Sequence, residues 1–321
     1  MGKVSLCFEY LKKYMEKGTT ELAGVLCVII ASVFWGTTGT SASYIPDVSS
    51  LAVGAFAMGI GGVLLVINAW QSLRQDVANL LRNRYLLIAG AACVAVYPLA
   101  FYSSMRLAGV AIGTLISIAT APFFTVLFER LISKRRISIQ WIVSFAVGAI
   151  GIVMLTLGKV ESIEALASSS PFLGGGLGLI AAFTYAGYSW VGKRLIEHDI
   201  SSKSSMASMF GLAAVVLIPS LSITGENLLR DTTHISVMLY MAVVPMFMGY
   251  LLFGYGLRHI SASKATLITL LEPAVATLFA VFLLGERFSV MGWFGLVLVS
   301  LCILLQVVKR PLFKSRLAAD L

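Results

Sequence analysis

Charged residues are scarce in this sequence: they make up 12% of its 321 residues, whereas hydrophobic residues make up 58% and the mean hydropathy is +0.91. A soluble domain needs a larger share of charged side chains on its surface, so this composition excludes the soluble globular class. It is typical of membrane proteins that cross the bilayer many times.

The residues that build most catalytic and metal centres are also few. No two carboxylates lie three or four residues apart within an apolar stretch, and the patterns HExxH and GxxxxGK[ST] are absent. The cysteines and histidines, which have no metal-ligand spacing, are Cys7, Cys27, Cys93, Cys302, His198, His234 and His259. We therefore expect no enzyme activity, no metal, no cofactor and no direct use of ATP.

Ten apolar segments of about 20 residues can be drawn, each long enough for an α-helix to cross a hydrocarbon layer of about 30 Å. The segments are 22–44, 48–69, 85–105, 110–132, 139–158, 172–192, 204–224, 235–257, 261–284 and 290–308. The predicted fold class is an all-α membrane protein with ten transmembrane helices.

The net charge of +9 could indicate nucleic acid as a partner, but the positions of the basic residues argue against it. With a cytoplasmic N-terminus, all but four of the 24 Lys and Arg residues face the cytoplasm, as is usual for membrane proteins. The four exceptions are Arg106, Lys159, Arg230 and Arg287. We therefore expect cytoplasmic tails at 1–21 and 309–321, and no cleaved signal peptide before the first span.

The second half of the sequence repeats features of the first at an offset of 151 residues, which places Pro122 on Pro273. The same offset brings six residues between Leu22 and Gly36 onto identical residues in the second half. We predict two five-helix repeats at 22–158 and 172–308, joined by a linker at 159–171. Because five is an odd number, the second repeat must be inverted in the membrane.

Glu272 and Pro273 lie side by side in the middle of segment 261–284. A charged side chain at a helix centre costs about 2.5–3.5 kcal/mol, so an acid at this depth usually faces a cavity or a partner. Pro273 has no N–H and leaves backbone polar groups to be satisfied elsewhere. The equivalent of Glu272 in the first repeat is Ala121, so only the second repeat carries the acid.

Hydroxyl and aromatic side chains near the middle of the spans mark a candidate site between the repeats. Tyrosines at this depth are too far inside to be interface anchors, and prolines in several spans suggest helices that bend around a central space. For the hydroxyl groups, bonding within their own helix remains an alternative. The predicted substrate-binding residues are Thr37, Ser41, Tyr97, Ser117, Tyr185, Tyr188, Tyr250 and Glu272, and the predicted helix-breaking residues are Pro98, Pro122, Pro245 and Pro273.

The order of these features resembles the EamA-domain family of the drug/metabolite transporter superfamily over about residues 22–308. The features are five plus five spans, the run Phe34-Trp35-Gly36, and the Glu272-Pro273 helix that closes in Leu284-Gly285-Glu286-Arg287. The resemblance implies a bacterial inner-membrane carrier, often an exporter of amino acids, amines or related metabolites, with its site between the repeats. The first repeat has Lys134-Arg135 in place of the Gly-Glu pair, which argues against a symmetric pair of glutamates.

We expect a secondary active transporter that exports a small molecule, such as an amino acid, an amine or a drug-like compound, by alternating access. Its expected partners are this substrate and the lipid bilayer, and protons as coupling ion and a homodimer are left open. An inverted repeat within one chain fits alternating access better than a channel, which usually surrounds an oligomeric axis. A channel and a membrane protein without transport activity are the alternatives.

Two roles are open for Glu272. In the first, its carboxyl is protonated from the outside and releases the proton when a cationic substrate binds from the inside, with Lys264 as a second group that favours the charged form. In the second, the carboxyl bonds backbone groups that Pro273 leaves free and stabilises the broken helix.

The distribution of basic residues predicts that a reporter active only in the periplasm is inactive when fused after Leu321. The same reporter fused after Glu226, in a loop predicted to lie outside, should be active and serves as the control. Periplasmic activity of the Leu321 fusion would contradict the topology and, with it, the inverted relation of the two halves.

Overall fold

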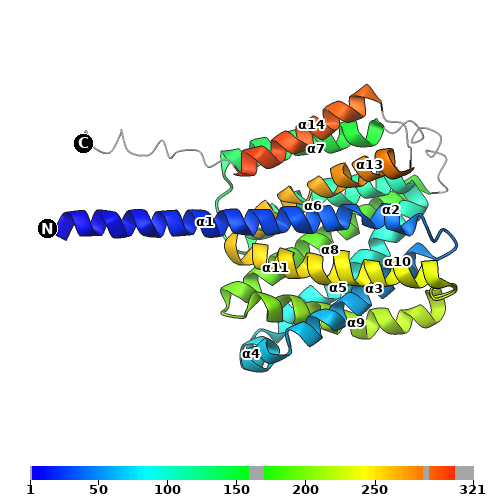
Figure 1. The fold of residues 1–321 in the computed structure, drawn as a ribbon, viewed down its shortest axis with the longest axis horizontal. Helices are drawn as coiled ribbons and strands as arrows, with labels where there is room; N and C mark the ends of the chain where they lie inside the picture. The colour runs from blue at the N-terminus through cyan, green and yellow to red at the C-terminus, as the bar shows by residue number, and fades with distance from the viewer. Residues whose placement is uncertain (1, 159–169, 285–288, 308–321) are drawn as a thin grey trace.

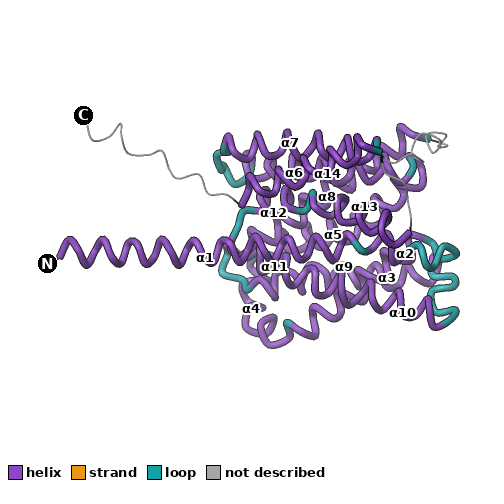
Figure 2. The backbone as a smooth tube through the Cα atoms, turned by 45° about the horizontal axis from the view of Figure 1, so that its top comes forward, coloured by secondary structure: helices purple, strands orange, loops and turns teal. Residues whose placement is uncertain are grey.

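The computed structural model describes residues 2–158, 170–284 and 289–307, and every regular element in these ranges is a helix (Figure 2). The α-helices, with one π-helix called η2, are α1 (Gly2–Gly36), α2 (Thr38–Ala42), α3 (Ser50–Asn68), α4 (Trp70–Arg82), α5 (Arg84–Ala108), α6 (Val110–Leu131), α7 (Ile139–Leu157), α8 (Pro171–Glu197), α9 (Ser202–Thr224), α10 (Thr232–Met241), η2 (Ala242–Met248), α11 (Gly249–His259), α12 (Ala262–Ile268), α13 (Leu271–Leu284) and α14 (Val290–Val307). Helices satisfy their backbone groups internally, which is what long apolar segments require in lipid.

Nine helical stretches in the described ranges are long and apolar enough to cross a membrane, and they coincide with nine of the ten predicted segments. The sixth predicted segment, 172–192, lies in α8, which has 27 residues but is diluted by glycines and tyrosines. The chain is therefore a multi-pass α-helical membrane protein, and a crossing by α8 stays a prediction.

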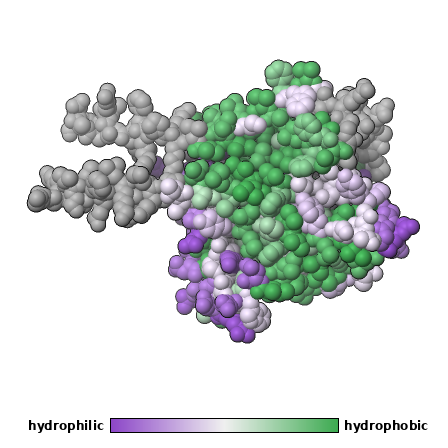
Figure 3. Space-filling view, viewed as in Figure 1, coloured by the Kyte–Doolittle hydropathy of each residue, from purple (hydrophilic) through white to green (hydrophobic). Residues whose placement is uncertain are grey.

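The long helices lie side by side, and the loops between them gather at two ends of the bundle (Figure 1). α4 lies across one end, where loops 132–138 and 198–201 are also found; we call this the α4 end. Between the two ends the visible surface is a broad hydrophobic band (Figure 3). Large hydrophobic side chains of the spans, such as Val215 and Phe282, are exposed in the structure. Apolar surface on this scale is what a lipid environment would cover.

Three of the predicted spans are not continuous α-helices. The first is interrupted at Thr37, between α1 and α2, and the eighth passes through the π-helix η2 around Pro245. The ninth is interrupted at Thr269 and Leu270, between α12 and α13. The N-terminal segment, which we predicted as a separate tail, continues without a break from Gly2 into the first span.

Pro98 and Pro122 lie inside α5 and α6, and both helices continue through them. The prediction that these two prolines break their helices is therefore wrong. Each proline removes one backbone hydrogen bond, and a helix packed among other helices tolerates that loss without ending.

Close helix packing depends on glycine at the contact between α7 and α14. A Cβ atom added to Gly295 would lie 2.5 Å from the backbone nitrogen of Leu155 and 2.6 Å from the carbonyl oxygen of Gly151. Only glycine allows two backbones to approach so closely, as is usual at helix contacts in membranes. The other extensive contacts join α5 to α8, α3 to α9, α6 to α8 and α1 to α11.

We expect Gly295→Ala to lower the free energy of unfolding by about 1–3 kcal/mol, because the new methyl group must push two backbones apart. Gly176→Ala is the matched control, since a Cβ atom there meets nothing within 4 Å. The control should be neutral or stabilising, because alanine favours a helix over glycine by about 1 kcal/mol. Unfolding in detergent measures both variants, and equal stability of Gly295→Ala and the unmodified protein would contradict the packing argument.

Candidate functional site

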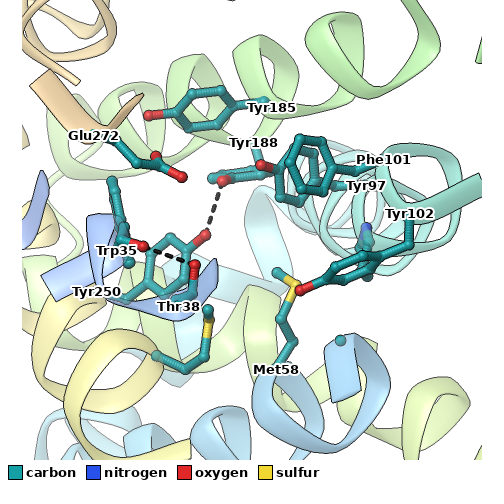
Figure 4. Close-up of a pocket in the computed structure, with 13 residues that line it drawn as sticks. Trp35, Thr38, Met58, Tyr97, Phe101, Tyr102, Tyr185, Tyr188, Tyr250 and Glu272 are labelled. Atoms are coloured by element: carbon teal, nitrogen blue, oxygen red, sulfur yellow. Dashed lines mark hydrogen bonds between the residues drawn. The ribbon is translucent and has the colours of Figure 1, made fainter. Parts of the chain in front are cut away.

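A small cavity lies in the middle of the bundle (Figure 4), where eight helical elements meet. It is lined by Trp35, Thr38, Gly54, Met58, Tyr97, Pro98, Phe101, Tyr102, Tyr185, Tyr188, Met246, Tyr250 and Glu272. Its free volume of about 50 Å³ has room for a few water molecules. These residues come from both halves of the chain, and aromatic rings form most of the wall.

Glu272 is the only acid of this lining, and its carboxyl group points into the space between Trp35, Tyr185 and Tyr188 (Figure 4). Among the described residues, no side chain or backbone N–H donates a hydrogen bond to this carboxyl group. An acid at this depth without a partner is costly, and such residues usually serve a function.

The helix break beside Glu272 follows from Pro273. Proline cannot donate to the carbonyl of Thr269, and this carbonyl instead accepts a hydrogen bond of 3.0 Å from the backbone nitrogen of Glu272. The chain thereby tightens for one turn between α12 and α13. This replacement hydrogen bond uses the backbone of Glu272 and not its carboxyl group, so the carboxyl group can face the cavity.

Tyr185 of α8 connects the opposite helix to this break. Its hydroxyl lies 2.7 Å from the Thr269 Oγ1 atom, and Thr269 Oγ1 donates its own hydrogen to the carbonyl of Thr266 at 2.9 Å. Since a hydroxyl has one hydrogen, Tyr185 must be the donor to Thr269. This bond fixes the position of the break against α8.

A second backbone irregularity lies across the cavity, at Pro245 in η2. The indole nitrogen of Trp35 donates a hydrogen bond of 2.8 Å to the carbonyl of Pro245, a residue 210 positions later in the chain. The Trp35 ring also packs on Tyr250, with 4.9 Å between the ring centroids. Trp35 therefore joins the end of α1 to the irregular part of the eighth predicted span.

The remaining tyrosines form one connected cluster. The hydroxyl groups of Tyr188 and Tyr250 share a hydrogen bond of 2.9 Å (Figure 4). The ring of Tyr97 lies 5.7 Å from that of Tyr185 and 5.9 Å from that of Tyr188, measured between centroids. Rings at these distances stabilise each other and present both faces and hydroxyl groups to the cavity.

Five of the eight predicted substrate-binding residues thus line one cavity: Tyr97, Tyr185, Tyr188, Tyr250 and Glu272. The other three make hydrogen bonds elsewhere. Thr37 bonds the carbonyl of Phe34 and the hydroxyl of Tyr240, Ser41 bonds the carbonyl of Thr37, and Ser117 bonds the carbonyl of Gly113. Binding of a substrate by any of the eight residues stays a prediction.

Sequence reasoning missed Trp35, Thr38, Met58 and Tyr102 as cavity residues. The helix break at Thr37 turns Thr38 inward, and its hydroxyl donates to the carbonyl of Trp35 at 2.7 Å (Figure 4). A regular helix would place Thr37 and Ser41 on one polar face, so the sequence pattern gave no sign of the break at Thr37. The aromatic spacing of Tyr97 and Phe101 was a signal that could have extended the site along α5.

Several charged residues near the ends of the spans pair with one another, and none of the described ones pairs with Glu272. Lys264 forms an ion pair of 2.9 Å with Glu21, so this lysine does not stabilise the Glu272 carboxylate. At the end opposite α4, Asp47 accepts a hydrogen bond of 2.9 Å from His234 and pairs with Arg230 at 3.2 Å. The bond from His234 is the main cause that lowers the pKa of Asp47 below its ordinary value.

No group of three or more potential metal ligands occurs in the part of the chain that the structure describes. Fold and cavity together define a class: a multi-pass helical membrane protein whose centre holds aromatic rings and one acid. The model of the EamA-like transporter family matches residues 22–157 and again residues 172–308. The chain belongs to this family, which confirms the family predicted from the sequence.

Individual relatives agree with this assignment. The uncharacterized transporter YwfM of Bacillus subtilis is 30% identical, with 87% of this chain and 92% of the relative covered. The uncharacterized inner membrane transporter YicL of Salmonella typhimurium is 24% identical, with 88% and 94% covered. A protein crystal structure at 16% identity superposes with a TM-score of 0.74 and covers 88% of this chain and 95% of its own, which shows a common fold.

The bond between Tyr185 and Thr269 can be tested with a double-mutant cycle. Tyr185→Phe and Thr269→Val should each destabilise the protein, and their coupling energy should be about 0.5–1.5 kcal/mol, as for one buried hydrogen bond. Thr277→Val is the control partner, because Thr277 bonds the carbonyl of Pro273 on its own helix. Unfolding in detergent measures the cycle, and additive effects of Tyr185→Phe and Thr269→Val would show that the bond is absent.

Proposed function

We propose that this protein is a secondary active transporter that exports a small amphipathic cation, such as an amine or an amino acid derivative, by alternating access. The observation that carries the proposal is the Glu272 carboxyl group, which faces a cavity of aromatic rings without a partner among the described residues. Membership of a transporter family supports the same conclusion.

The chemistry of the cavity favours a cation with an apolar part. A positive charge over the face of a tyrosine or tryptophan ring gains about 0.5–2 kcal/mol, and the rings of Trp35 and Tyr250 lie in contact on one side of Glu272. A carboxylate buried among aromatic rings is stable as an anion only beside a positive charge. Substrate and carboxylate would therefore neutralise each other.

The cavity is too small in this state for most metabolites. Its volume of about 50 Å³ compares with about 300–1,000 Å³ for typical ligand pockets. A substrate can enter only if the surrounding helices move apart. This requirement agrees with alternating access, in which the site opens to one side of the membrane at a time.

The motion would follow from ten crossings arranged as two inverted halves, with α8 as the sixth. The 151-residue offset supports this arrangement. When each helix is replaced by its equivalent in the other half, 151 residues away, one helix contact becomes another that is also present. It maps the contact of α5 with α8 onto that of α11 with α1, and the contacts of α3 with α9 and of α7 with α14 onto themselves. A two-fold relation between the halves produces such pairs.

We further propose that Glu272 exchanges a proton for the substrate. The alternative, in which its carboxyl bonds backbone groups freed by Pro273, receives no support, since the freed carbonyl of Thr269 already accepts from a backbone nitrogen. An empty site would hold the carboxyl protonated, and an arriving cation would displace the proton. Outside protons entering down their gradient would then drive export.

We place the protein in a bacterial inner membrane with both termini and the α4 end in the cytoplasm. The α4 end contains the basic residues of loop 132–138 and of α4 itself, which agrees with the usual excess of positive charge on the cytoplasmic side. Relatives that carry the name inner membrane transporter support the location.

Glu272→Gln keeps the shape of the side chain but cannot ionise, so accumulation of a cationic substrate driven by an imposed pH difference should disappear. Exchange of substrate for substrate and expression should survive. The measurement uses proteoliposomes and a panel of amines and amino acid derivatives, and Glu226→Gln, in an exposed loop, is the matched control.

The outcomes separate the proposals. Accumulation by Glu272→Gln in response to a pH difference would overturn proton coupling by this residue. Absence of transport by the unmodified protein for every cation tested, with transport of anions or neutral solutes, would overturn the substrate class.

A further inference from the structure

A second pocket lies at the α4 end, between the ends of α6 and α14 and the beginnings of α7 and α12. Its volume is about 240 Å³, and it shares no residue with the central cavity. The lining is Val126, Glu129, Arg135, Arg136, Ile137, Ser138, Trp141, Ser261, Ser263, Lys264 and Gln306. The proposed transport mechanism uses none of these side chains.

Gln306 is the unusual residue of this pocket. The residue is 6% exposed, yet its side-chain amide nitrogen has no hydrogen-bond partner in the described part of the chain. A buried donor without an acceptor is costly, and native proteins contain few of them. Since the side chain lines a pocket, a molecule with an acceptor group in that pocket would supply what the amide lacks.

One base of the pocket is available to an anionic ligand. Both carboxyl oxygens of Glu129, the acid of the lining, already accept hydrogen bonds. One comes from the backbone nitrogen of Ser263 at 3.3 Å and the other from the Ser263 hydroxyl at 2.5 Å. Arg135 pairs with Glu197, and Lys264 pairs with Glu21. Arg136 forms no ion pair within the described ranges, so its guanidinium is available to a ligand.

Helix α7 begins at the same pocket and adds to its positive potential. Ser138 caps the helix by accepting a hydrogen bond of 3.1 Å from the backbone nitrogen of Trp141. The N-terminus of a helix of 19 residues carries a partial positive charge and attracts anions. Val126, Ile137 and Trp141 supply an apolar wall beside these groups.

We propose that this pocket binds a phosphate group, held by the Arg136 guanidinium and the Gln306 amide. Arginine matches phosphate oxygens with two parallel hydrogen bonds, and an amide donates one more. The group can belong to an anionic phospholipid, since the pocket lies where the apolar helices α6, α7 and α14 begin or end, or to a small phosphorylated molecule. Basic pockets between helices at the cytoplasmic side are known to hold lipid head groups.

The test uses the full-length protein, purified in phosphate-free detergent, and measures its thermal unfolding midpoint with three additives. Phosphatidylglycerol presents an anionic phosphodiester, phosphatidylcholine presents a head group without net charge, and inorganic phosphate presents the free anion. We expect phosphatidylglycerol to raise the midpoint and phosphatidylcholine not to do so, because only a ligand that binds the folded state stabilises it. An effect of inorganic phosphate equal to that of phosphatidylglycerol would assign the pocket to a free phosphorylated molecule.

Arg136→Gln and Gln306→Leu should each raise the dissociation constant for the effective additive roughly tenfold, since each removes a hydrogen bond to a charged group. Lys203→Gln is the matched control, because Lys203 is an exposed base at the same end and lies outside the pocket. Gln306→Leu also removes the unpartnered amide, so without additive its midpoint should equal or exceed that of the unmodified protein.

Three results would overturn the proposal. They are a midpoint that none of the additives raises, an equal response to phosphatidylglycerol and phosphatidylcholine, and a response that survives in Arg136→Gln. If Gln306→Leu did not fold, Arg136→Gln, which changes an exposed side chain, would decide alone. Transport by the central cavity is measured separately, so failure here leaves that proposal standing.

Discussion

Lipid offers no hydrogen bonds, and this constraint explains how the centre of the molecule is built. Every backbone carbonyl or N–H that a helix irregularity frees at this depth must find a partner within the protein. At Pro245 the partner is the indole nitrogen of Trp35, and at the break before Pro273 it is the backbone nitrogen of Glu272. Each of the three interrupted spans contributes a cavity residue within two positions of its interruption, namely Thr38, Met246 and Glu272.

The same side chains support the backbone and form the site. Tyr185 donates to Thr269 at the break, and its ring is part of the cavity wall. The hydroxyl groups of Tyr188 and Tyr250 are hydrogen-bonded to each other, which fixes the positions of these two wall residues. Glu272 differs from these residues, because no described residue forms a hydrogen bond with its carboxyl group. The proposed exchange of a proton for a cation depends on this acid.

Much of the fold could be read from the sequence, because spans in lipid are defined by length and hydropathy. Nine predicted segments coincide with helical stretches of membrane-spanning length, and the family assignment is confirmed. Five predicted site residues line one cavity, since an acid or a tyrosine at mid-span has few stable environments other than a cavity. The second pocket was not predicted, because Arg136 and Gln306 lie 170 positions apart and look like ordinary span ends.

The sequence alone thus determined that the chain crosses a membrane, roughly where it does so, and that Glu272 is the exceptional residue. Only the tertiary structure decided which side chains surround Glu272. Breaks at Thr37 and Thr269 rotate the following residues away from the faces that a regular helix predicts, so Thr38 lines the cavity and Thr37 does not. Lys264, close to Glu272 in sequence, pairs with Glu21 of α1 because helix packing brings these two together. Periodicity describes one helix, whereas partners are set by how different helices pack.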